Sequence, residues 1–87
     1  MSHYIYILYS NKIDKYYVGY SQDPEKRLTF HNSEYNKIWS KRGQPWESKV
    51  VIEFSDKKAA LQAEKFVKRQ KSIDYIKKVI QAGKIVY

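Results

Sequence analysis

The stretch YIYILYSNKIDKYYVGY, residues 4–20, decides the fold of this chain. Residues 4–10 and 15–20 are rich in β-branched and aromatic side chains, a composition typical of β-strands. Asn11 and Asp14 lie among the polar residues between these two segments, and such residues favour a turn. The stretch therefore predicts a pair of antiparallel strands at the beginning of the chain.

Alternation along the predicted strands sorts their side chains onto two faces. In the simplest pairing, with no bulge in the turn, Tyr6 lies opposite Tyr17. The same pairing sets Tyr4 opposite Gly19, and all four residues then share one face. The other face is the better candidate for the core, and it receives Ile5, Ile7, Tyr16 and Val18.

A helix is predicted directly after the strand pair. The segment Asp23-Pro24-Glu25 begins it, because aspartate caps a helix, proline suits the first helical position and glutamate suits the helix dipole. The helix should run to about His31 or Asn32. Arg27 and His31 are four residues apart and share a helix face. This arrangement could bring two phenols, a guanidinium and an imidazole together, which are groups that a phosphodiesterase could use.

The remaining sequence predicts one more strand and two more helices. Residues 33–47 are polar and basic, with breakers of regular structure at Gly43 and Pro45, and residues 49–55 favour a strand. Ser55 or Asp56 caps the next helix, which should run to about residue 70. A cap at residue 72 begins the last helix, which should end at residue 83. The expected inward-facing residues are Ala59, Ala60, Ala63, Phe66 and Val67, then Ile73, Ile76 and Ile80.

The length and order of these elements define the expected fold. The chain has 87 residues, which is enough for a single domain over residues 1–87. The order ββαβαα predicts a mixed α/β fold of the α+β type, with a small three-stranded antiparallel sheet flanked by helices. The absence of cysteine excludes disulfides and thiolate metal sites. No apolar run approaches the roughly 20 residues of a membrane span, and the start of the chain lacks a secretory signal, so we expect a cytoplasmic protein that does not bind membranes.

The charge of the chain points to a polyanionic partner. Seventeen Lys and Arg residues against nine Asp and Glu residues give a net charge of +8. In so small a protein this favours nucleic acid as the first candidate. The alternative is a basic surface that serves solubility alone.

The order of the motifs resembles the GIY-YIG nuclease domain, which is named after two tripeptides. Tyr4-Ile5-Tyr6 stands for the first, with tyrosine in place of glycine, and Tyr17-Val18-Gly19 stands for the second, with valine in place of isoleucine. Arg27 and His31 follow where the family has an arginine and, in some members, a histidine. The resemblance covers about residues 4–85, and the chain is similar to the short, stand-alone bacterial-type members.

The resemblance implies a phosphodiesterase of the endonuclease type, and it implies a role for each catalytic residue. Arg27 would bind the scissile phosphate, and Tyr17 would orient water or the phosphate. Tyr6 would deprotonate or position the attacking water, with help from His31. Because a phenol titrates near pH 10, Tyr6 needs a lowered pKa to act as a base. The positive charges of Arg27 and of a metal ion act in that direction.

The family also carries a metal-binding glutamate on a helix after the third strand, and Glu64 is the best match. We therefore expect one concave surface to be lined by Tyr6, Tyr17, Arg27, His31 and Glu64. The resemblance therefore implies one divalent ion, Mg²⁺ or Mn²⁺, bound through oxygen ligands. Two alternatives stay open: Glu64 pairs with Lys68 on the helix surface, or Glu53 in the third strand takes its place. Many members have an asparagine further along the chain after the glutamate, whereas this chain has none after Asn36.

The basic stretch after the first helix is expected to bind the substrate. Its lysine and arginine side chains can contact phosphates, and a tryptophan can stack on an unpaired base. Trp46, just before a strand, is instead expected to cover the core. A glycine inside a strand often marks close approach by a ligand. The predicted nucleic-acid-binding residues are Gly19, Lys37, Trp39, Lys41, Arg42 and Lys49.

The sequence therefore predicts a metal-dependent endonuclease that hydrolyses phosphodiester bonds in nucleic acid, in DNA before RNA. It would select its substrate by structure, or a protein partner would supply that specificity. One alternative is a non-catalytic DNA- or RNA-binding module on the same fold. A more distant alternative is a protein-interaction domain whose basic surface meets an acidic partner.

Overall fold

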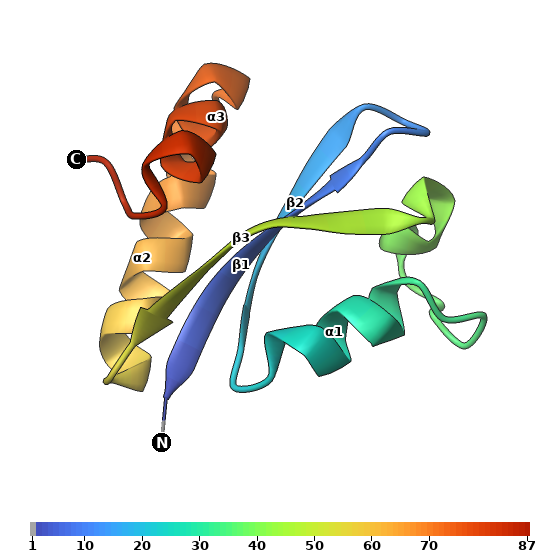
Figure 1. Ribbon diagram of the computed structural model, residues 1–87, viewed down its shortest axis with the longest axis horizontal. Helices are drawn as coiled ribbons and strands as arrows, with labels where there is room; N and C mark the ends of the chain where they lie inside the picture. Colours follow the sequence, from blue (N-terminus) through green and yellow to red (C-terminus); the bar gives the residue numbers. More distant parts are fainter. Residues whose placement is uncertain (1) are drawn as a thin grey trace.

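The computed structural model describes residues 2–87 and contains a three-stranded antiparallel sheet in the order β2-β1-β3 (Figure 1). The strands β1 (His3–Ser10) and β2 (Lys15–Ser21) form a hairpin, and β3 (Trp46–Phe54) pairs with the other side of β1. A short 3₁₀ helix, η1 (Trp39–Gly43), precedes β3. The predicted α+β fold with the order ββαβαα is confirmed.

The hairpin register differs from the simplest pairing by two residues. Tyr6 pairs with Gly19, and Tyr17 pairs with Leu8, so the predicted pairing of Tyr6 with Tyr17 is wrong. The reason is a loop of residues 11–14, in which Asp14 adopts the left-handed conformation with φ 51°. Because a shift of two residues preserves the alternation, the predicted sorting of side chains onto two faces still holds.

One face of the sheet is covered by α2 (Lys57–Gln70) and α3 (Ile73–Ala82), as Figure 1 shows. The core between these layers consists of Ile5, Ile7 and Val18 from the sheet and Ala60, Ala63, Val67 and Val79 from the helices. The expectation that Ile73 points inward is wrong, because it is the first residue of α3 and is 54% exposed. Val79, which the sequence pattern had left out, is completely buried instead.

The other face is covered by α1 (Pro24–His31) and by the segment that contains η1 (Figure 1). The Asp23 carboxylate caps α1 by accepting a hydrogen bond from the Lys26 backbone, as the sequence predicts. Strand β3 begins earlier than expected, since the Asn32 side chain bonds both backbone groups of Trp46 and holds it in line with the strand. Trp46 is buried, which confirms its predicted place in a core.

None of the helices within residues 2–87 is long and apolar enough to cross a membrane.

Candidate active site

The Tyr6 side chain lies in the interior, beneath the surface that the sequence predicted it to line. It is only 2% exposed. A Cβ atom on residue 19 would overlap the phenol ring and its hydroxyl oxygen, so Gly19 makes room for Tyr6. Gly19 was expected to mark close approach by a ligand. In the structure, the group that approaches its backbone is the Tyr6 phenol, and Gly19 is buried.

His31 is completely buried at the end of α1 and connects Tyr6 to the η1 segment. Its Nε2 atom lies 3.1 Å from the Tyr6 hydroxyl oxygen, and its Nδ1 atom lies 2.9 Å from Ser40 Oγ. Burial, and after it the charge of Arg27, lower the pKa of His31 from 6.5 to about 4. The imidazole is therefore neutral at pH 7, with one nitrogen that carries a proton and one that can accept a proton.

A second set of polar groups holds His31 in place. Asn36 Nδ2 donates to the His31 carbonyl oxygen at 3.0 Å and to Ser40 Oγ at 2.8 Å. Ser40 is anchored in turn, because Trp46 Nε1 donates to its carbonyl oxygen. Both Asn36 and Ser40 are completely buried. Sequence reasoning missed these residues, since a polar loop gives no signal that two of its side chains turn inward.

Tyr17 lies between the buried groups and the surface. Its ring centroid is 4.4 Å from that of His31 and 6.2 Å from that of Tyr6, with the two phenol rings stacked. On its other side the Tyr17 ring contacts Trp39, at 5.6 Å between centroids. Tyr17 is partly exposed, whereas Tyr6 is buried.

Arg27 supplies the positive charge of this cluster. Its guanidinium lies over the Phe30 ring, 4.7 Å from the centroid, and it is partly exposed. Burial raises the pKa of Tyr6 above its usual value of 10, and the neighbouring Arg27 acts in the opposite direction through hydrogen bonding and charge. The expected lowering by Arg27 is thus present, but burial outweighs it.

Glu64 belongs to the layer that covers the opposite face of the sheet. It lies on α2, and its negative charge is one of the smaller causes that raise the pKa of Tyr6. The Glu64 side chain is 20% exposed and forms an ion pair with Lys68 at 3.3 Å, as the surface alternative predicted. Glu53 is exposed and accepts a hydrogen bond from the Ser2 hydroxyl group. Among residues 2–87 no group of three or more His, Cys, Asp or Glu side chains is arranged to hold a metal ion.

The five predicted site residues therefore differ in how deeply they are buried. Tyr6 and His31 lie inside, whereas Tyr17, Arg27 and Glu64 are partly exposed. Tyr6 and Tyr17 share a sheet face, as predicted, but the five residues do not all line one surface. The arrangement offers a neutral imidazole hydrogen-bonded to a buried phenol, together with an arginine and a second phenol that are partly exposed.

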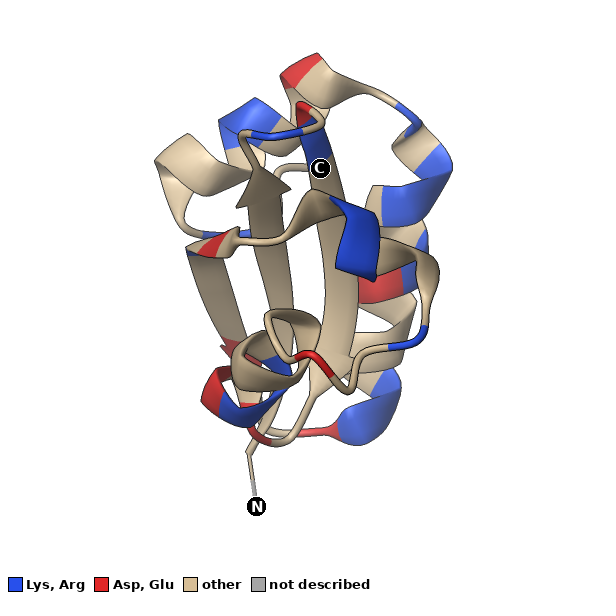
Figure 2. Ribbon diagram, turned by 90° about the vertical axis from the view of Figure 1, so that its right-hand side faces the viewer, with Lys and Arg blue, Asp and Glu red and all other residues tan. Residues whose placement is uncertain are grey.

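The structure brings together only some of the predicted nucleic-acid-binding residues. A surface hollow on the η1 segment is lined by Lys37, Ile38, Trp39, Lys41 and Arg42. Figure 2 shows basic positions both in η1 and along α2. Lys49 lies apart from this hollow, on β3, where it pairs with Glu47 at 3.2 Å and lies over the Tyr9 ring.

Comparison with known proteins gives this geometry its context. Residues 2–76 match the family described as the GIY-YIG catalytic domain. The chain belongs to the GIY-YIG family. The resemblance that the two tripeptides suggested is thereby confirmed.

Similar proteins of the family are small bacterial UPF0213 proteins. The chain is 32% identical to YazA of Bacillus subtilis and to a UPF0213 protein of Bacillus velezensis, over 99% of this chain and 89% of each relative. It is also 32% identical to a UPF0213 protein of Streptococcus pneumoniae, over 78% of this chain and 68% of that one. The solution NMR structure of the UPF0213 protein BH0048 from Bacillus halodurans superposes with a TM-score of 0.60 at 26% identity, covering 94% of this chain and 85% of that one.

Proposed function

We propose that this GIY-YIG protein is a metal-dependent endonuclease that hydrolyses phosphodiester bonds in nucleic acid. The observation that carries the proposal is the bond between the Tyr6 hydroxyl group and a neutral, buried His31, with Arg27 and Tyr17 beside it. Membership of the family makes a nuclease the first reading of this cluster. The cluster supplies both an acceptor for a proton and a cation for a phosphate.

Arg27 binds the scissile phosphate in this proposal. Its guanidinium can donate paired hydrogen bonds to phosphate oxygens, and it is partly exposed, so a substrate can reach it. Such a contact also neutralises the charge that builds up around phosphorus during attack. Tyr17, which lies at the solvent side of His31, orients the attacking water or the phosphate.

Tyr6 and His31 move the proton of the attacking water. As the water attacks phosphorus, its proton passes to the Tyr6 oxygen while the Tyr6 proton passes to His31 Nε2. Tyr6 is then never a free phenolate, which agrees with its raised pKa. Burial is the larger cause of the lowered pKa of His31, and the charge of Arg27 adds to it. A phosphate bound at Arg27 would offset this second contribution and so make His31 a better proton acceptor.

Glu64 is the residue that would hold a divalent ion. A single half-buried carboxylate suits Mg²⁺ or Mn²⁺, because such ions are often held by one or two carboxylates, with water and substrate phosphate as the other ligands. The charge of Glu64 acts on Tyr6, which supports its being near the reacting groups. When bound, the ion would stabilise the leaving oxygen. Lys68 must release Glu64 for this to happen, since the two are paired.

The nucleic acid would lie over the exposed loop cations. Lys37, Lys41 and Arg42 surround Trp39 and can contact phosphates on either side of a stacked base. We propose DNA as the first substrate and RNA as the second. Selection by nucleic-acid structure, or by a protein partner, would supply the specificity that so small a surface lacks.

A non-catalytic nucleic-acid-binding module is the second candidate. One observation favours it: the ion pair with Lys68 that occupies Glu64. The chain also has no asparagine after Asn36, where many family members carry one after the glutamate. In this case the basic loop would bind nucleic acid, and no phosphodiester bond would be cleaved.

Single-turnover cleavage measured beside equilibrium binding separates the two candidates. DNA and RNA substrates that are single-stranded, nicked or flapped are each tested with Mg²⁺ or Mn²⁺ against a chelator. We expect Arg27→Ala and Glu64→Ala to reduce cleavage by about 10²–10³. Tyr6→Phe should abolish most cleavage and leave binding unchanged, since it removes one buried hydroxyl group and keeps the ring.

The matched control for Tyr6→Phe is Tyr4→Phe, on the same strand and the same face. Tyr4→Phe should cleave as the wild type does. Equal turnover of wild type and Tyr6→Phe would remove Tyr6 from the chemistry. Metal-independent binding without turnover in any protein would favour the binding module.

A further inference from the structure

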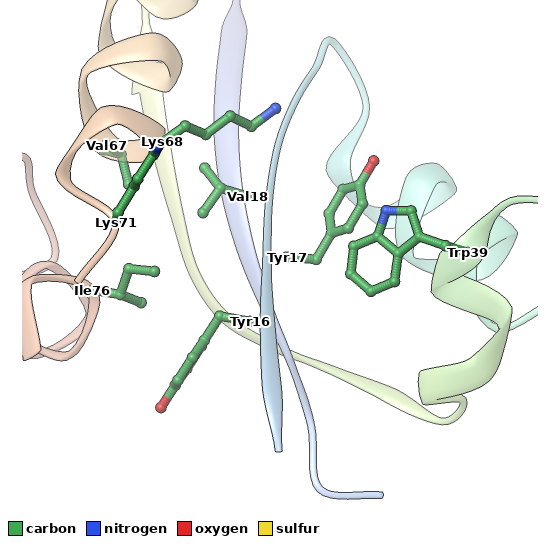
Figure 3. A pocket seen from close by; sticks show the side chains of 8 residues that line it. All are labelled: Tyr16, Tyr17, Val18, Trp39, Val67, Lys68, Lys71 and Ile76. Atoms are coloured by element: carbon green, nitrogen blue, oxygen red, sulfur yellow. The ribbon is translucent and has the colours of Figure 1, made fainter. Parts of the chain in front are cut away.

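A pocket of about 380 Å³ lies next to the proposed active site, at the free edge of β2. Its size is at the lower end of the range of ligand pockets, roughly 300–1,000 Å³. Figure 3 shows Tyr17 and Trp39 on one side of β2, and Lys68 and Lys71 of the α2 end on the other. The pocket therefore extends from one layer of the fold to the other around the strand edge.

Trp39 is the aromatic wall of this pocket, and it is unusually open for a tryptophan. Its side chain is 51% exposed. It is nevertheless held in position, because its ring centroid lies 5.6 Å from that of Tyr17 and 5.9 Å from that of the buried Trp46, edge-on. Trp39 thus offers a supported aromatic surface to the solvent, directly beside a proposed catalytic residue.

Positive charge lies on both sides of Trp39. Lys68 and Lys71 line the pocket at the β2 edge, while the hollow on the other side of Trp39 is lined by cations of the η1 segment, namely Lys37, Lys41 and Arg42. Lys68 is engaged by Glu64, whereas Lys71 is exposed at the C-cap of α2. An aromatic surface flanked by cations is the arrangement that binds unpaired nucleotides, with the base on the ring and the phosphates on the cations.

We propose that this pocket binds an unpaired nucleotide adjacent to the scissile phosphate, and that the protein therefore acts on single-stranded segments. The base stacks on Trp39, and Lys71 contacts a phosphate of the same strand. A base in a duplex has both faces stacked on its neighbours, so it can reach Trp39 only after it is unstacked. The inference rests on the proposed function for the reaction, but the binding preference can be measured without it.

The edge of β2 leaves room for such a strand. Within residues 2–87, β1 is the only strand that pairs with β2, so its outer edge is not covered by another strand. Tyr17 borders both the pocket and the His31 cluster. A nucleotide stacked on Trp39 would consequently lie next to Tyr17, at the border of the His31 cluster.

The test compares Trp39→Ala with Tyr35→Ala by fluorescence anisotropy in the presence of a chelator, so that no bond is cut. Tyr35 is an exposed aromatic residue of the same segment that lines neither hollow. The probes are a single-stranded DNA, the same sequence as a duplex, and the matching single-stranded RNA. Wild type should bind the single strands more tightly than the duplex. Trp39→Ala should lose about 5- to 150-fold in single-strand affinity and leave duplex affinity unchanged, while Tyr35→Ala should match the wild type.

A second variant, Lys71→Asn, tests the phosphate contact. Asparagine tolerates the left-handed conformation that Lys71 adopts, with φ 48°, so the helix end should be kept. The slope of log affinity against log salt for the single strand should fall by about 0.7. Equal binding of duplex and single strand by the wild type, or equal loss of both in Trp39→Ala, would overturn the inference.

These outcomes are distinguishable from failure of the proposed function. If single strands bind in a Trp39-dependent manner but are not cleaved, the inference about the pocket holds and the proposed nuclease function is wrong. If the protein cleaves duplex DNA and Trp39→Ala has no effect, the proposed nuclease function holds and the inference about the pocket is wrong. The two single-stranded probes show whether the pocket distinguishes DNA from RNA.

Discussion

The two faces of the sheet bury different kinds of groups. The fully buried core residues under α2 and α3 are all aliphatic, among them Ile5, Ile7 and Val67, and partly buried aromatic side chains pack against them. The face under α1 and η1 also buries His31, Asn36 and Ser40. Aliphatic burial stabilises the fold in proportion to its area and tolerates small shifts. A buried polar group is tolerated only when its partners are in place, so the second face depends on geometry rather than on area.

On the proposed function, this difference gives one face the main role in stability and the other face the chemistry. Each of the buried polar groups near His31 has a hydrogen-bond partner. Such a network fixes one arrangement of the side chains, which is what a proton-transfer site requires. Substitutions on the two faces should therefore have separable effects.

The largest effect is expected from Ile7→Ala on the aliphatic face. Ile7 is completely buried, and its truncation should reduce the free energy of unfolding by about 2–5 kcal/mol through lost burial and an added cavity. Urea denaturation followed by circular dichroism measures the change. Leu61→Ala, on the partly exposed surface of α2, is the control and should change stability by less than about 1 kcal/mol. Similar losses in both variants would contradict the assignment of this face to stability.

The next effect is a dependence of stability on pH that comes from the other face. The unfolded chain protonates His31 near pH 6.5, whereas the folded chain does so only near pH 4. Between these values the unfolded state binds more protons, so the free energy of unfolding falls as the pH is lowered, by about 3 kcal/mol over the whole window. The buried imidazole thus destabilises the fold in acid and has no such effect above pH 6.5.

The measurement is the difference between wild type and His31→Gln in urea titrations at pH 7, 5 and 4. The carboxyl groups titrate in both proteins and largely cancel in the difference. The wild type should lose more stability than the variant as the pH falls. Parallel pH profiles of the two proteins would show that the pKa of His31 is not lowered by folding.

Alternation and capping signals explain why the sequence predicted the aliphatic face well. These signals act between residues two to four positions apart in the chain. The sorting of side chains onto two sheet faces and the capping of α1 by Asp23 could therefore be predicted from the sequence. The hairpin register did not follow, because the conformation of Asp14 decides it and several loop lengths suit the same strands. Ile73 was misplaced since the first turn of a helix can extend beyond the core that the rest of the helix covers.

The face under α1 and η1 was predicted only in part. The motifs indicated Tyr6, Tyr17 and His31 as neighbours, and the structure brings them together. Nothing in the sequence indicated that His31 would be completely buried, or that Ser40 would contact it. Those facts depend on how the segment before β3 folds over α1, and this is decided by contacts between residues far apart in the chain, such as those of Asn32 with Trp46.

The smallest effect on stability, and the most specific test of the polar face, is expected from Ser40→Ala. The distances around His31 allow either neutral tautomer, but the proposed proton transfer needs the proton on Nδ1, directed at Ser40 Oγ, so that Nε2 can accept from Tyr6. Ser40→Ala removes the acceptor and should shift His31 towards the Nε2–H tautomer. The ¹⁵N chemical shifts of the imidazole report the tautomer directly, and any cleavage should fall in parallel.

Ser10→Ala is the matched control, because Ser10 is also completely buried and its hydroxyl group donates to the Gly43 carbonyl oxygen at 2.7 Å. Each serine hydroxyl group takes part in two hydrogen bonds, so both variants should lose about 1–2 kcal/mol of stability. Only Ser40→Ala should change the imidazole shifts, and Ser40→Thr, which keeps the hydroxyl group, should restore them. If wild type and Ser40→Ala share one tautomer, then Ser40 stabilises the fold but does not orient His31. The division between a face for stability and a face for chemistry would in that case stop at His31 itself.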